Sequence, residues 1–179
     1  MVKKLYIKDK AKFELYKKQK QKYIKILETI ADIGQNGTTL NKKEGDKKTP
    51  EGIFNLGIAF GTKNTINNNK INYRKINKNL YWVDDVESTY YNQLVNIKNI
   101  KKDWKSAEHL IEYPEEYKYA IEIKSNPTNE KGKGSAIFLH CSKNKPTAGC
   151  VAIECSKMQE VINQIDNNTI IIIFGNKNN

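Results

Sequence analysis

The sequence predicts a mostly β fold, because many short apolar runs alternate with turn signals and few segments have a helical period. Its 179 residues can bury one core but are few for two, so we expect a single domain spanning residues 1–179. Hydrophobic residues make up 38% of the chain and cluster in those runs, which argues against a disordered protein.

The N-terminal half is expected to form strands joined by loops. Glycines mark a turn at residues 34–37, and a Gly-Asp pair with a following proline marks a tight loop at 44–52. Residues 62–80 are rich in asparagine and predict a long surface loop or weak hairpin. The strands expected here cover residues 13–16, 23–27, 53–60 and 80–83, the first two forming a hairpin.

The C-terminal half is expected to hold two helices. One is a short helix over residues 106–113 with Ser106 as its N-cap. The other follows Ser156, which forms a capping-box pattern with Gln159 ahead of apolar residues at i, i+3, i+4 and i+7. Those apolar residues are Met158, Val161, Ile162 and Ile165. The strands expected here cover residues 119–123, 135–139 and 169–174.

The chain is strongly basic, with 31 lysines and arginines and a formal net charge of +11. Arg74 is the only arginine, whereas base recognition in DNA depends heavily on the bidentate arginine side chain. We therefore interpret the lysines as a solvated surface and expect no nucleic-acid partner. The longest apolar run, residues 170–174, has only strand length and the N-terminus lacks a signal core, so we expect no stable membrane insertion.

Cysteine and histidine are scarce, and their spacing does not match a zinc motif. The three cysteines Cys141, Cys150 and Cys155 lack paired C-x-x-C spacing, and the chain has only two histidines, so we expect no metal site. The odd count leaves at least one thiol outside any intrachain disulfide. Cys141 and Cys155 are interpreted as packed thiols, with a disulfide left open, and His109 as a residue on a helix surface.

The segment from His140 to Cys150 has the residue types of a nucleophilic site. A loop that leaves one strand end and returns near it can hold an imidazole beside a thiol, and the imidazole can take the thiol proton to give a thiolate–imidazolium pair. Gly149 has no Cβ and lets a substrate carbonyl approach backbone N–H groups, which would stabilise an oxyanion. Thr147 would hydrogen-bond within the loop and orient the site.

These residues resemble the signature of the YkuD-type L,D-transpeptidase family, a histidine followed after a loop by Ser/Thr-His-Gly-Cys. His140 matches the first histidine, Thr147 the Ser/Thr, Gly149 the glycine and Cys150 the nucleophile. The segment 48–54, Lys-Thr-Pro-Glu-Gly-Ile-Phe, resembles the family's Thr-Pro-x-Gly-x-Phe strand entry.

The chain also departs from that signature. Ala148 stands where most members have a second histidine, and Ala152 stands where many have an arginine. The resulting Thr-Ala-Gly-Cys sequence resembles a branch of the family that includes L,D-carboxypeptidases. Cys150 and His140 are retained, so we expect activity.

The resemblance implies a β-sandwich-like catalytic domain with a few short peripheral helices. It implies a cysteine acyltransferase of cell wall biogenesis and cell shape, which attacks tetrapeptide stems of peptidoglycan, releases D-alanine and forms 3-3 cross-links without a cofactor. Transfer to water would instead make it an L,D-carboxypeptidase that trims the stems to tripeptides. The substrate implies an extracytoplasmic location, in the cell wall or periplasm, with the export segment absent from this chain. The alternative from another class is a non-catalytic basic module that binds the cell wall.

Overall fold

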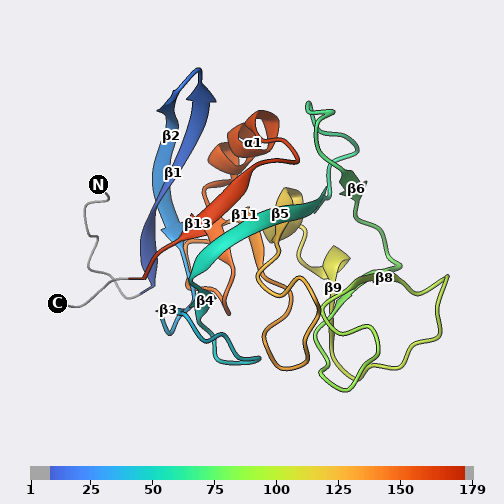
Figure 1. The fold of residues 1–179 in the computed structure, drawn as a ribbon. Helices are drawn as coiled ribbons and strands as arrows, with labels where there is room; N and C mark the ends of the chain where they lie inside the picture. The colour runs from blue at the N-terminus through green and yellow to red at the C-terminus, as the bar shows by residue number, and fades with distance from the viewer. Residues whose placement is uncertain (1–8, 176–179) are drawn as a thin grey trace.

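The computed structural model describes residues 9–175, which are mostly β-strand with one α-helix (Figure 1). The expected mostly β fold is therefore confirmed. The largest element is an eight-stranded mixed sheet in the order β1-β2-β12-β11-β10-β5-β13, with β6 beside β5. Its strands are β1 (Lys10–Gln19), β2 (Lys22–Asp32), β5 (Gly52–Gly61), β6 (Tyr73–Lys75), β10 (Ala120–Ile123), β11 (Phe138–Cys141), β12 (Val151–Ile153) and β13 (Ile170–Ile173).

Smaller elements complete the described part of the chain. A three-stranded antiparallel sheet has the order β8-β7-β9, and β3 and β4 form a two-stranded parallel pair. Their bounds are β3 (Thr38–Thr39), β4 (Thr49–Pro50), β7 (Leu80–Val83), β8 (Leu94–Asn96) and β9 (Ala107–His109). The helical elements are α1 (Cys155–Gln164) and the 3-10 turns η1 (Leu110–Glu112) and η2 (Glu116–Lys118). None of the helices among residues 9–175 is long and apolar enough to span a bilayer.

The main sheet has a separate apolar core on each face, because side chains alternate along its strands. On one face, Leu139 of β11 packs with the buried residues of α1, which lies behind β13 in Figure 1. On the opposite face, Phe138 packs edge-on against Trp82 of β7, with ring centroids 4.8 Å apart. The three-stranded sheet therefore covers the second face, and Cys150 is buried in that second core.

The predicted helix over residues 106–113 is wrong. Residues 107–109 form β9 and pair with β7, and only the short turn η1 follows. His109 is accordingly not on a helix surface but stacks on Tyr81, its partner across the strands, with ring centroids 4.2 Å apart. Strand pairing in the folded protein outweighs the local helical preference of this segment.

Two other boundaries also differ from the prediction. The strand expected at residues 135–139 begins only at Phe138, because Ala136 has a positive φ of 51° that interrupts extended backbone. The helix predicted after Ser156 is confirmed, but Glu154 is its N-cap residue and makes no capping hydrogen bond. Ser156 lies in the first turn, where its hydroxyl donates to the Glu154 carboxylate.

Candidate functional site

Parallel pairing of β11 and β12 brings His140 and Cys150 to the same face of the main sheet. Leu139 pairs with Val151 and His140 with Ala152. Cys150 directly precedes β12, so it lies beside Phe138, one pleat away from His140 on the same side. Both side chains are buried, with 8% of His140 and 9% of Cys150 exposed.

The thiol of Cys150 is bound to the backbone rather than to the imidazole. It donates to the Ala136 carbonyl and accepts from the Phe138 N–H, both at 3.3 Å, and no hydrogen bond joins it to His140 within residues 9–175. Burial, reinforced by the nearby Glu108 carboxylate, raises the pKa of the Cys150 thiol to about 12. The resting side chain of Cys150 is therefore a thiol and not the thiolate of an ion pair.

The ring of His140 is held in one tautomer. Nδ1 lies 2.9 Å from the Cys141 carbonyl oxygen, and because a carbonyl only accepts, Nδ1 carries the proton. Burial lowers the pKa of the imidazole, so the ring is neutral at pH 7 and Nε2 retains its lone pair. The ring of Tyr117 stands edge-on to it, with centroids 5.7 Å apart. A neutral imidazole and a neutral thiol therefore lie on the same face of the main sheet.

Two threonine hydroxyls fix the peptide that follows Cys150. Thr147 Oγ1 donates to the Cys150 carbonyl at 2.7 Å and accepts from the Gly149 N–H at 3.2 Å. Thr49 Oγ1 donates to the same carbonyl at 3.3 Å and accepts from the Gly34 N–H at 2.8 Å. Each hydroxyl donates one bond and accepts another, so the Cys150 carbonyl is held both from its own loop and from a part of the chain 101 positions away.

Gly149 occupies a backbone position that disfavours any other residue. Its φ is +147°, and a Cβ would lie 3.0 Å from both the Lys48 carbonyl oxygen and Ile137 Cδ1. Since the Gly149 N–H is engaged by Thr147, the Cys150 N–H is the better candidate of the two expected oxyanion donors.

Several residues at this site were not singled out from the sequence. Thr49 lies in the Thr-Pro-x-Gly segment, so the family resemblance was the only signal for it. No sequence pattern pointed to Glu108 as a site residue, because the helix expected at 106–113 would have given its side chain another orientation. No sequence pattern pointed to Tyr117 either, whose hydroxyl donates to Glu108.

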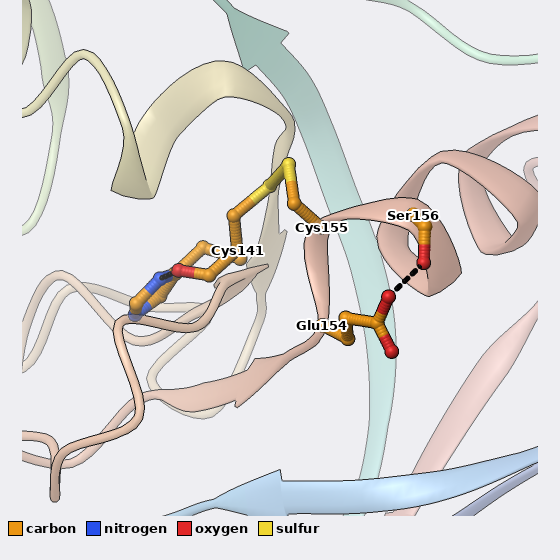
Figure 2. Close-up of a disulfide and its surroundings, with 5 residues drawn as sticks. Cys141, Glu154, Cys155 and Ser156 are labelled. Carbon is orange, nitrogen blue, oxygen red and sulfur yellow. Dashed lines mark hydrogen bonds between the residues drawn. A yellow bond between two sulfur atoms is a disulfide. The ribbon is translucent and has the colours of Figure 1, made fainter.

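Cys141 and Cys155 form a disulfide, so their interpretation as packed thiols is wrong. Their Cα atoms are 4.5 Å apart and 14 positions apart in sequence. Figure 2 shows the bridge, with Glu154 and Ser156 next to Cys155 at the start of α1. The bridge ties the end of β11 to α1, and the carbonyl of Cys141 is the group that holds His140. Cys150 is the free cysteine.

One comparison with known proteins, the scan of protein families, identifies a family. The L,D-transpeptidase catalytic domain (YkuD) matches residues 5–173 of the chain. No curated protein matches it. Among solved structures, the chain is similar to Bd1075 of Bdellovibrio bacteriovorus, with 22% identity and a TM-score of 0.47 over 91% of this chain. The match covers 44% of Bd1075, so this chain spans less than half the length of that protein.

Proposed function

Because the chain belongs to the L,D-transpeptidase catalytic domain (YkuD) family, we propose that it is a peptidoglycan L,D-transpeptidase with Cys150 as nucleophile and His140 as base. One observation carries the assignment of roles. The Cys150 thiol and the His140 imidazole are buried on one sheet face, with Nδ1 occupied and Nε2 available. The proposed catalytic unit is a single domain over residues 1–179.

In the first half-reaction, His140 Nε2 takes the thiol proton as Cys150 Sγ attacks the amide between the L-centre of the third residue and the terminal D-alanine. The Cys150 N–H stabilises the tetrahedral oxyanion. When the C–N bond breaks, the imidazolium returns the proton to the leaving amine, and D-alanine departs. A thioester on Cys150 and a neutral His140 remain.

In the second half-reaction, an amine of another stem attacks the thioester and forms a 3-3 cross-link. Because the pKa of the Cys150 thiol is raised, the thiol must lose its proton as it attacks. The reaction rate therefore depends on the base that accepts this proton. The Thr-Ala-Gly-Cys sequence favours a second candidate, L,D-carboxypeptidase activity, in which water attacks and a tripeptide stem is the product. Ala148 is exposed at this position, where most members have a histidine.

The location we propose is extracytoplasmic, in the cell wall or periplasm. Peptidoglycan stems are found there, and disulfides such as Cys141–Cys155 persist in oxidising compartments. The lysine-rich surface supports association with acidic wall polymers through long-range attraction.

Mass spectrometry of a tetrapeptide muropeptide incubated with the protein tests this function. Wild type is expected to release D-alanine and to carry an acyl adduct, whereas Cys150→Ala and His140→Ala should do neither. His109→Gln, a change of the other histidine, whose ring nitrogens bond to Glu112 and the Lys78 carbonyl, should behave as wild type. An unchanged substrate without an adduct on wild type would refute the enzyme and favour a wall-binding module.

A further inference from the structure

Three carboxylates lie close together although the chain as a whole is strongly basic: Glu108, which lies near the Cys150 thiol, and Asp84 and Glu44, which lie near Glu108. Glu108 of β9 is the cross-strand partner of Trp82, and Asp84 follows Trp82 by two positions, so both side chains lie on the face that covers the second core. Glu44 extends the group from the loop before β4. Its Oε2 accepts from the hydroxyls of Tyr91 at 2.5 Å and Ser135 at 2.7 Å.

These carboxylates have no salt-bridge partner in the part of the chain that the structure describes. Within residues 9–175, none of the ion pairs involves Glu44, Asp84 or Glu108. Oδ1 of Asp84 is shielded from solvent and accepts no hydrogen bond in this part of the chain. Unpaired carboxylates and an unsatisfied buried oxygen are costly, so the site is suited to a cationic group from outside the chain.

Glu108 is the member of the group positioned to handle a proton. Its Oε2 accepts from the hydroxyl of Tyr117, a residue that also stands against the His140 ring, and this leaves Oε1 available. Burial, with the neighbouring charges of Asp84 and Glu44, raises the pKa of Glu108 to about 7. A base whose pKa lies near the working pH can both accept and return a proton.

We propose that Glu108 is the catalytic base that deprotonates the acceptor amine in the second half-reaction, with Glu44 and Asp84 attracting the ammonium to the site. This inference rests on the proposed function and assigns a residue to its acceptor step. An amine arrives at neutral pH as an ammonium ion, which has no lone pair for attack. The carboxylates both attract the ammonium and remove the proton that blocks its reaction.

The step balances as follows. One ammonium proton passes to Glu108 Oε1, and the freed nitrogen lone pair attacks the thioester carbon. The C–N bond forms and the C–S bond breaks. The second nitrogen proton passes to His140 Nε2 and from there to the departing Cys150 sulfur. Glu108 releases its proton to solvent. Attack by water has no ammonium to deprotonate, so Glu108 matters to cross-linking and much less to trimming.

The test separates the two half-reactions in wild type, Glu108→Gln and the matched control Glu112→Gln, a change of an exposed carboxylate on η1. A tetrapeptide muropeptide at high concentration acts as donor and acceptor. We expect Glu108→Gln to acylate Cys150 and form tripeptide at rates within about threefold of wild type, while dimer formation falls by about a hundredfold or more, the range of a lost general base. Tyr117→Phe should weaken dimer formation less.

The pH profile separates a base from a structural role. In wild type the ratio of dimer to tripeptide should rise with pH through about 7 as Glu108 ionises and then level off. In Glu108→Gln the ratio should show no inflection near 7 and should only follow the free-amine fraction of the acceptor. The other titratable or charged groups around Glu108 remain in both proteins. They are Glu44, Asp84, Tyr113, Tyr117, Cys150, His140 and Lys42.

The remaining outcomes contradict the proposal. Equal dimer formation by wild type and Glu108→Gln overturns it, and so does loss of acylation in Glu108→Gln, which would place the residue in the first half-reaction. Wild type that acylates but yields only tripeptide overturns it while the Cys150 chemistry stands. Wild type that never acylates refutes the proposed function itself, and this inference with it.

Discussion

The disulfide between Cys141 and Cys155 should contribute about 3 kcal/mol to the free energy of unfolding. The bridge closes a loop across 14 positions, and a loop of about this length gives roughly 3 kcal/mol in the chain-entropy description. Domains of this kind are stable by roughly 5–15 kcal/mol, so reduction should remove a large share of the total. With a urea dependence of about 2 kcal/mol per molar, the unfolding midpoint should fall by about 1.5 M.

Urea unfolding of the Cys150→Ala protein with and without a phosphine reductant measures this difference in one sequence, without the free thiol. Thiol titration of wild type in denaturant should find one thiol before reduction and three after it. Three thiols before reduction would show that the bridge does not form. A bridge that forms but leaves the midpoint unchanged on reduction would refute the magnitude. Because the Cys141 carbonyl holds His140, reduction should also slow acylation of wild type.

Further predictions concern the loop and its titratable groups. Thr147→Val should lower the acylation rate at least tenfold by losing about 1.4 kcal/mol or more of hydrogen bonding, and Thr147→Ser should retain most of it. Gly149→Ala should lower the unfolding free energy by about 1–3 kcal/mol in urea titrations, since its Cβ meets the Lys48 carbonyl at 3.0 Å. Glu108 has a folded-state pKa of about 7 against 4.5 unfolded, so it binds more protons when folded and its contribution to stability is lost as pH rises between these values. Unfolding at pH 5 and pH 8 should show this loss, at most about 3 kcal/mol, in wild type and not in Glu108→Gln. Since burial lowers the pKa of His140, D-alanine release should be independent of pH above about 6.5, and a rise through pH 8 would contradict a neutral resting base.

The parts of the fold that the sequence predicted are those whose signal is local. Short apolar runs between turn signals located the hairpin β1–β2, the continuous apolar run at residues 170–174 located the last strand β13, and the 3.6-residue period located α1. The segment 106–113 failed because its conformation is decided by pairing with β7, more than twenty positions earlier. No periodicity within the segment records that pairing.

The same distinction separates the predicted from the unpredicted parts of the site. His140 lies on β11 and Cys150 directly precedes the adjoining strand β12, ten positions later, so a sequence pattern can contain both of them. Thr49 reaches the Cys150 carbonyl across 101 positions. Glu108 approaches the thiol only because two sheets pack face to face around Trp82 and Phe138. Strand register and sheet packing bring Thr49 and Glu108 to the site, and no single segment of the sequence encodes either of them.

The opposite charges of the surface and of the site act over different distances. The net charge of +11 produces a field that attracts an anionic polymer from beyond contact, but salt screens that field within about 8–10 Å. If a stem binds at Cys150 as proposed, the charges that matter are those of the poorly solvated groups near the thiol. Among the described residues, Glu108 with its neighbours Glu44 and Asp84 outnumbers Lys42 there. Raising salt should therefore weaken association with the wall more than it changes the preference for an amine over water. A partition ratio as salt-sensitive as wall binding would show that the lysine surface, and not the buried carboxylates, selects the acceptor.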